Sequence, residues 1–225
     1  MNLKEHYSNL YKTAIANILS DHYDIDDLID SDSDNRYGIT LLIRPSIEVK
    51  ENLQKFLGEL KQVEPDQYYY PNSDIHITLM SIISCYEGFD INTIDLPKYI
   101  ALIKKCLTTN AIEIQFKGLT ASNSCIMVQG FMNNNSINTI RDNLRTAFKN
   151  SYLEQSLDKR YAIQTAHATL VRFRKKFSEK DKFLDILEHY KNFDFGTFKV
   201  DCLELVYNDW YQREGLVKKL HVFKI

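Results

Sequence analysis

The chain has 225 residues, of which 44% are hydrophobic and 26% charged, and its formal net charge is −2. This composition indicates an ordinary globular protein with one substantial core, or two small lobes that share one. The slightly acidic balance argues against a surface that binds nucleic acid everywhere, because such domains carry a strong basic excess. The longest apolar runs are far shorter than the roughly 20 residues that a membrane helix needs.

The N-terminal residues and the cysteines predict the compartment. Residues 1–6 lack the basic region, apolar block and cleavage site of a secretory signal, so we expect a cytoplasmic protein without a membrane span. The cysteines show no Cys-x-x-Cys spacing, which favours reduced, buried thiols over disulfides or a zinc site. They are Cys85, Cys106, Cys125 and Cys202. No other spacing supplies a complete set of metal ligands, and we expect neither a metal nor a cofactor.

The first elements of the chain are a helix, an acidic loop, a strand and a second helix. Apolar residues at spacings of three and four predict an amphipathic helix over residues 5–20. The Asp-rich segment Asp21–Asp34 predicts a polar loop. Residues 37–44 are apolar and β-branched and stop at Pro45, which predicts a strand; a helix from the N-cap Ser46 to about Val63 follows.

The order strand, helix, strand then occurs a second time along the chain. After a strand around residues 76–79 we expect a helix over 97–107, strands over 112–119 and 125–131, a helix over 136–149, a strand around 167–170, a helix over 178–190, and strands over 197–207 and 217–225. This order predicts an α+β protein of two lobes related by approximate internal symmetry. No Ser- or Gly-rich linker separates the lobes. We therefore predict an N-terminal extension, residues 1–35, and one bilobal domain, residues 36–225.

The pattern His-x-Thr-Leu occurs twice, as His76-Ile77-Thr78-Leu79 and His167-Ala168-Thr169-Leu170. Residues two apart in a strand share a face, so each motif presents an imidazole beside a hydroxyl and turns its apolar residues toward the core. With only six His in the chain, two such matches favour a functional pair over coincidence. The remaining histidines are expected to be structural: His6, His22, His189 and His221.

Two imidazoles that face each other across a cleft suit acid-base catalysis. An unperturbed His titrates near pH ~6.5, so at neutral pH one imidazole can accept a proton while the other donates one. Hydroxyls beside them can stabilise the charge that develops on a phosphoryl group during in-line transfer. Serine hydrolase chemistry is poorly supported because the chain contains no Gly-x-Ser-x-Gly elbow.

These two motifs resemble the twin signatures of the two-histidine, or 2H, phosphoesterase superfamily, which includes RNA 2′,3′-cyclic phosphodiesterases historically called 2′-5′ RNA ligases. The resemblance spans roughly residues 36–225 by element order, and it is specific at the two motifs. It implies a bilobal α+β fold with two pseudo-symmetric sheet-and-helix lobes around a central cleft. It also implies that His76 and His167 act as acid and base and that Thr78 and Thr169 bind the phosphate.

Further substrate contacts are expected from one arginine and several aromatic residues. Arg172 opens the basic run Arg172–Lys176 after the second motif, although strand alternation puts it on the opposite face from His167 unless the strand ends or twists. Nucleobases stack on aromatic rings, for which Trp210 is the best candidate. The other candidates are Tyr68, Tyr69, Tyr70, Tyr207 and Tyr211, each of which has core or rim packing as the alternative.

The sequence thus predicts a metal-independent phosphodiesterase for 2′,3′-cyclic phosphates, 2′-5′ linkages or a small cyclic nucleotide, including cyclic oligonucleotides. Its expected partners are nucleotides or RNA ends. Two alternatives stay open, namely a catalytically inactive nucleotide- or RNA-binding module and an RNA 2′-5′ ligase. The sequence leaves open which His is the base, the physiological substrate and the oligomeric state.

Overall fold

The computed structural model describes residues 2–159 and 162–225 and has the predicted α+β class. Its helices are α1 (Leu3–Leu19), α2 (Ile47–Val63), the 3-10 helix η1 (Ile91–Thr93), α3 (Leu96–Cys106), α4 (Ser136–Lys149) and α5 (Lys180–Tyr190). Its strands are β1 (Arg36–Ile43), β2 (Tyr68–Tyr69), β3 (Ile77–Glu87), β4 (Ile112–Ser122), β5 (Cys125–Met132), β6 (Ala168–Arg172), β7 (Asp194–Val200), β8 (Cys202–Asp209) and β9 (Lys218–Lys224). No helix in these ranges is both long and apolar enough to cross a membrane.

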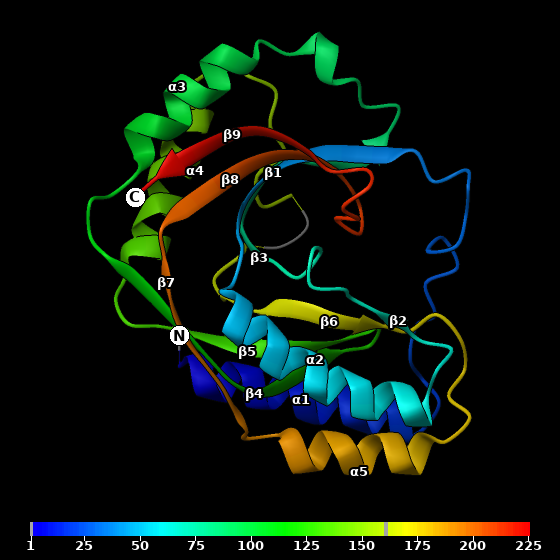
Figure 1. Ribbon diagram of the computed structural model, residues 1–225. Helices are drawn as coiled ribbons and strands as arrows, with labels where there is room; N and C mark the ends of the chain where they lie inside the picture. Colours follow the sequence, from blue (N-terminus) through cyan, green and yellow to red (C-terminus); the bar gives the residue numbers. More distant parts are fainter. Residues whose placement is uncertain (1, 160–161) are drawn as a thin grey trace.

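The strands form one curled antiparallel sheet in the order β7-β4-β5-β6-β3-β1-β8-β9, and β2 pairs with β6 (Figure 1). The order falls into two halves of four strands. We call β3, β1, β8 and β9 the first lobe, and β7, β4, β5 and β6 the second lobe, because each contains one His-x-Thr motif. Between β3 and β6, the central neighbours, the structure pairs Ile77 with Ala168. The two lobes therefore meet at the motifs, as the predicted symmetry requires.

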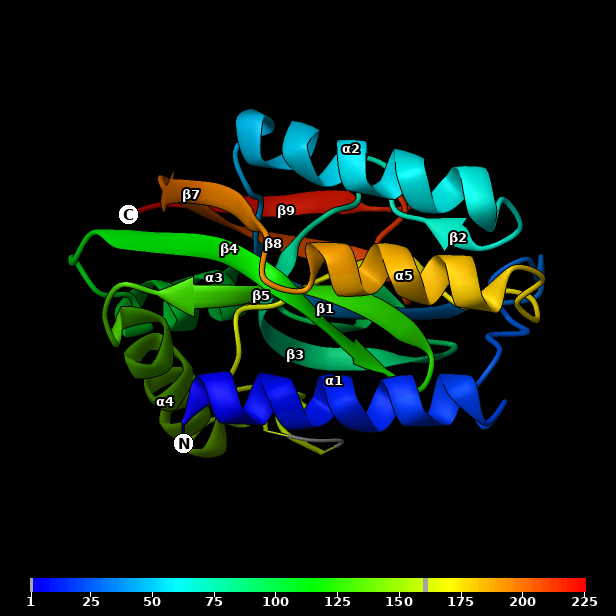
Figure 2. The same cartoon turned by 90° about the horizontal axis from the view of Figure 1, so that it is seen from below.

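The helices cover the outer faces of the two lobes. Figure 2 shows α1, α5 and α2 side by side across the second lobe. Helix α1 packs on β4, whereas α2 packs on β7 and α5. Helices α3 and α4 pack on each other, and α4 contacts β3 of the first lobe. Helix α1 buries Tyr7, Tyr11, Ala14 and Ile18, a helical spacing that explains why it docks by one face.

One predicted strand, residues 197–207, is wrong. The chain forms β7 up to Val200 and β8 from Cys202, and the two strands lie in different lobes. Strand β7 pairs with β4, while β8 pairs with β1 and β9. The alternating apolar residues run through both strands without a Gly or Pro between them, and so the period-two pattern does not reveal that the chain crosses from one lobe to the other at Asp201.

The predicted N-terminal extension, residues 1–35, is described except for Met1. It forms α1 and a loop that continues along the second lobe. The main-chain amide of Asp24 donates to the carbonyl of Asn123, and that of Asp26 donates to the carbonyl of Phe173. The boundary between this segment and residues 36–225 stays a prediction, and the packing of the segment bears on the site described next.

Candidate active site

Both motifs begin immediately before a strand, and the central pair of strands brings them together. Ile77 pairs with Ala168, so the antiparallel arrangement puts His76 beside Thr169 and Thr78 beside His167. All four side chains line one cavity of about 270 Å³. The apolar residues of the motifs are buried on the other side, as the alternation predicted: Ile77, Leu79, Ala168 and Leu170.

Arg172 joins this cavity because strand β6 contains a β-bulge. Thr169 pairs with Met127 and Val171 with Ile126, and this leaves Leu170 as an extra residue without a partner on β5. Such a bulge reverses the alternation. Leu170 and Val171 are consequently both buried, and Arg172 lines the cavity with His167. The expectation from simple alternation is thus wrong, and the bulge is the reason.

Strand β3 also contains β-bulges. Its register with β1 shifts at Leu79 and again at Ile82, so the cavity-facing residues come at intervals of three. Thr78, Ser81 and Ser84 therefore all line the cavity. Counted from the motif threonines, Ser81 occupies the position in the first lobe that Arg172 occupies in the second.

His76 is fixed by a main-chain carbonyl. Its Nδ1 lies 2.7 Å from the carbonyl oxygen of Asp74. A carbonyl can only accept, so Nδ1 carries the proton and Nε2 is free to face the cavity. Burial lowers the pKa of His76 from 6.5 to about 3; the bond to Asp74 opposes this shift, and the positive charges of Arg44 and Arg172 add to it. In the free protein His76 is therefore neutral at pH 7.

His167 is fixed by a side chain instead. Its Nδ1 lies 2.7 Å from the hydroxyl oxygen of Thr165, which can either donate or accept. Burial is the main cause that lowers the pKa of His167 to about 4, and the nearby charge of Arg141 adds to the shift. His167 is thus also neutral at pH 7 in the free protein, but both tautomers of its ring are compatible with its partner.

A buried arginine on α4 joins the two motifs. Arg141 is 0% exposed, and its guanidinium donates to main-chain carbonyls on both sides of the central strand pair. Nε lies 3.0 Å from the Leu79 oxygen, and Nη2 lies 3.3 Å from the Thr78 oxygen and 2.6 Å from the Thr165 oxygen. Arg141 therefore supports the first motif and the residue that orients His167. It occupies the apolar stripe of its helix, a periodicity signal that could have singled it out.

The environment of Arg172 includes two tyrosines that were expected to bind substrate. The Arg172 Nε donates to the Tyr70 hydroxyl at 2.9 Å, and its guanidinium carbon lies 5.5 Å from the centre of the Tyr211 ring. Tyr70 lines the cavity, but only 2% of it is exposed. Tyr211 is 0% exposed and is not part of the cavity lining. Both tyrosines are almost fully buried and contact Arg172, and their contact with substrate stays a prediction.

Trp210 does line the cavity, directly after β8. The guanidinium carbon of Arg36 lies 4.8 Å from the centre of its ring, and Arg36 is itself held by Asp34 at 2.7 Å. A cation over an aromatic ring fixes the ring in one orientation. Of the other aromatic candidates, Tyr68, Tyr69 and Tyr207 are half-buried and lie outside the cavity lining.

Much of the polar wall of the cavity consists of residues that were not predicted from the sequence. The missed lining residues are the hydroxyls Thr40, Ser81, Ser84 and Ser156, the amides Asn208 and Gln212, and the charged residues Asp158 and Lys159. They come from separate strands and loops, so no local pattern connects them. Among residues 2–159 and 162–225, no three His, Cys, Asp or Glu side chains come together as a metal site.

Comparisons with known proteins identify the family and the fold of the chain. The family described as "AKAP7 2'5' RNA ligase-like domain" matches residues 40–214. LigT of E. coli, in a crystal structure complexed with 3'-AMP, is 13% identical with a TM-score of 0.57, covering 84% of this chain and 98% of LigT. TT0787 of Thermus thermophilus is 13% identical, with a TM-score of 0.53 and coverages of 83% and 97%.

A third structure covers more of the chain. It is ATU0111 of Agrobacterium tumefaciens str. C58, a conserved protein of unknown function, which is 14% identical with a TM-score of 0.55; the alignment covers 93% of this chain and 98% of ATU0111. At these identities the likeness concerns the fold. No curated protein matches the chain in sequence.

Proposed function

This chain belongs to the AKAP7 2'5' RNA ligase-like domain family within the 2H phosphoesterase superfamily, and on that premise we propose that it is a metal-independent phosphodiesterase. Its substrates in this proposal carry a 2′,3′-cyclic phosphate, a 2′-5′ linkage or a small cyclic nucleotide. One observation carries the proposal: both imidazoles and both hydroxyls of the two motifs line a single cavity.

The proposed reaction uses one imidazole as base and the other as acid. For a cyclic phosphate, the neutral imidazole takes a proton from water as the water oxygen bonds to phosphorus. The bond between phosphorus and one ribose oxygen breaks, and the protonated imidazole gives that oxygen its proton. The pair thus holds the same number of protons before and after the reaction. Thr78, Thr169 and Arg172 would donate to the phosphoryl oxygens, on which negative charge develops.

The negative charge of the substrate phosphate would allow one of the two histidines to become protonated. Both histidines are neutral in the free protein, with pKa values lowered to about 3 and about 4, so neither is an acid at pH 7. An anionic phosphate between them favours the protonated form and raises the pKa of each ring. We therefore expect proton uptake when a phosphate ligand binds, detectable by calorimetry in buffers of different ionisation enthalpy.

A nucleotide would lie with its phosphate at the motifs and its base toward Trp210. Trp210 is half-buried and lies among the described residues that line the cavity, and stacking on such a ring is worth about 1 to 3 kcal/mol per base. The 3'-AMP named for the LigT crystal structure is a ligand of this class. This likeness supports nucleotides as the first substrates to test.

The test is a turnover assay in EDTA with 2′,3′-cyclic mononucleotides, 2′-5′ oligoadenylate and cyclic di- and trinucleotides. We expect His76→Ala and His167→Ala each to lower turnover by at least ~100-fold, the usual size of a general acid-base contribution. The exposed His189, on α5, provides the matched control His189→Ala, which should keep the parent rate. Near-normal turnover by both motif variants would reject the mechanism, and loss of activity in EDTA would reject metal independence.

One observation favours a second candidate, a nucleotide-binding module without catalysis. Two neutral imidazoles can accept hydrogen bonds from a ligand without any proton transfer. This candidate predicts nucleotide binding that survives both His replacements and no turnover by the parent. A ligase would run the same chemistry backwards, so trapping of a 2′-5′ joined product from RNA ends distinguishes it.

A further inference from the structure

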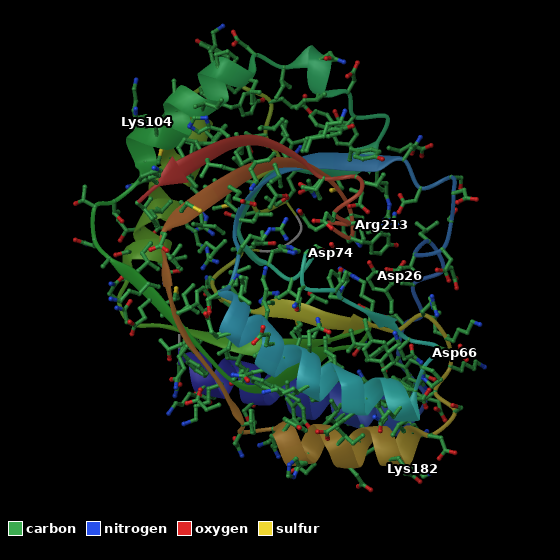
Figure 3. The ribbon with its side chains drawn as sticks, in the orientation of Figure 1. Asp26, Asp66, Asp74, Lys104, Lys182 and Arg213 are labelled. Carbon is green, nitrogen blue, oxygen red and sulfur yellow. The ribbon has the colours of Figure 1, made fainter. Side chains whose placement is uncertain are left out.

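The segment before residue 36 contacts the second half of the cavity. The family match starts at residue 40, so this segment lies outside it. Nevertheless α1 packs on β4, and the loop after α1 bonds to the main chain at Asn123 and Phe173. Figure 3 labels Asp26 on this loop, whereas Lys104 and Lys182 lie on the outer helices α3 and α5.

Asp26 forms an ion pair with Arg172, one of the cationic residues that line the cavity. Its Oδ2 lies 3.7 Å from Nη1 of Arg172, and the two side chains are only 16% and 17% exposed, respectively. Its Oδ1 accepts from the Tyr211 hydroxyl at 2.8 Å. The carboxylate is therefore itself held in place, and its main-chain amide is bonded to the carbonyl of Phe173, the residue after Arg172.

These contacts restrict Arg172 from three directions. Tyr70 binds Nε, Asp26 faces Nη1, and the ring of Tyr211 lies under the guanidinium. No hydrogen bond joins Nη2 to another described residue, and the Arg172 side chain lines the cavity. A free arginine side chain has about 2 kcal/mol of rotamer entropy, which is lost when it is fixed on a phosphate. A side chain that is already fixed avoids most of that loss when the ligand binds.

We propose that Asp26 is a positioning residue that holds Arg172 ready for an anionic phosphate, and that the N-terminal segment thereby completes the second half of the site. This inference rests on the proposed function, because that function places the phosphate beside Arg172. It adds a residue from outside the family match to the binding machinery. The ligand class is a nucleotide phosphate or inorganic phosphate, held through Arg172 rather than by Asp26 itself.

The loop offers a matched control for this proposal. Asp30 also pairs with an arginine, Arg174, at 3.5 Å, but its side chain is 63% exposed and neither residue lines the cavity. Asp26→Asn and Asp30→Asn thus remove the same charge from the same loop, and only the first touches Arg172. Asparagine keeps an oxygen that can accept from the Tyr211 hydroxyl, which limits damage to the fold.

The experiment combines binding of inorganic phosphate and of 3'-AMP, by calorimetry, with the NMR signal of the Arg172 Nε–H group, identified by its absence in Arg172→Lys. In Asp26→Asn we expect about tenfold weaker binding of both ligands, or about 1.4 kcal/mol, and a shifted or broadened Nε–H signal, since the ion pair that restrains Arg172 is lost. Asp30→Asn should leave both readouts unchanged.

Each other result overturns the proposal. An unchanged Nε–H signal means that Asp26 does not hold Arg172. Equal binding means that Asp26 does not contribute to ligand binding, and tighter binding means that its carboxylate competes with the ligand. If the parent binds neither phosphate nor 3'-AMP, Arg172 holds no phosphate. If the parent binds these ligands but hydrolyses nothing, the proposed catalysis fails while the role of Asp26 is still decided by binding.

Discussion

The two halves of the cavity share a backbone plan and differ in their side chains. In each half a histidine precedes the strand, a threonine follows two residues later, and a bulge brings a third residue to the cavity. That third residue is Ser81 in the first lobe and Arg172 in the second. The histidines differ too, because His76 is fixed by a carbonyl and His167 by the hydroxyl of Thr165.

The repeated backbone thus gives both halves the same geometry, while the side chains at equivalent positions give each half different chemical properties. The proton on Nδ1 of His76 is fixed by its acceptor, whereas the tautomer of His167 can change with its hydroxyl partner. At the equivalent third positions, Ser81 is neutral and Arg172 carries a positive charge. We therefore expect substitutions at equivalent positions of the two halves to change the activity by different amounts.

Arg141 joins the two halves, so its replacement should weaken both. Arg141→Met would leave the carbonyls of Thr78, Leu79 and Thr165 without this donor, and we expect the free energy of unfolding to fall by about 3 kcal/mol. Denaturant titration measures the loss, with the exposed Lys149→Met on the same helix as control. An NMR titration should also show a raised pKa for His167, because a nearby positive charge is removed.

Substitutions at the equivalent positions Arg172 and Ser81 test whether the charged residue contributes more to activity than the neutral one. Arg172→Met should lower kcat/KM by about 100-fold, the typical effect of one lost donor to a developing phosphoryl charge. Ser81→Ala should change kcat/KM by less than about fivefold, because its hydroxyl is neutral. Similar losses in both variants would show that the two halves contribute equally to phosphate binding.

Thr165 tests whether the partner of His167 matters for catalysis. Thr165→Val keeps the shape but removes the hydroxyl, and we expect kcat to fall about tenfold, the equivalent of one hydrogen bond. Thr165→Ser should restore the parent rate and the parent pH profile. A Thr165→Val variant with an unchanged profile would mean that the hydroxyl only fills space.

The pH dependence of stability tests whether both histidines are neutral in the folded protein. Both histidines have folded pKa values below the usual 6.5, at about 3 for His76 and about 4 for His167, so the unfolded chain binds more protons than the folded one between pH ~6.5 and ~4. Stability should therefore fall as the pH is lowered through this window. Urea unfolding at pH 7.5 and 5 should show a smaller fall in His76→Asn and His167→Asn than in the parent.

The sequence was sufficient for the motif strands, the helix positions and the α+β class, because these depend on local periodicity. It was insufficient where one extra residue in a strand moves the following side chains to the opposite face of the sheet. Arg172 was expected on the wrong side since the bulge at Leu170 depends on its pairing with β5, which no local pattern encodes. The break at Asp201 and the burial of Tyr70 and Tyr211 also follow from packing between distant segments.

The pairing of Ile77 with Ala168 has a consequence for how new specificities could arise or be engineered in this scaffold. A continuous ladder would hold the two central strands about 4.8 Å apart along their length. Here the lobes diverge beyond the motifs, so the space available to a substrate depends on the residues of the walls and loops. Substrate size could then change by substitutions at positions such as Ser81, Ser156 and Trp210, while the paired residues that hold the reactive groups stay constant.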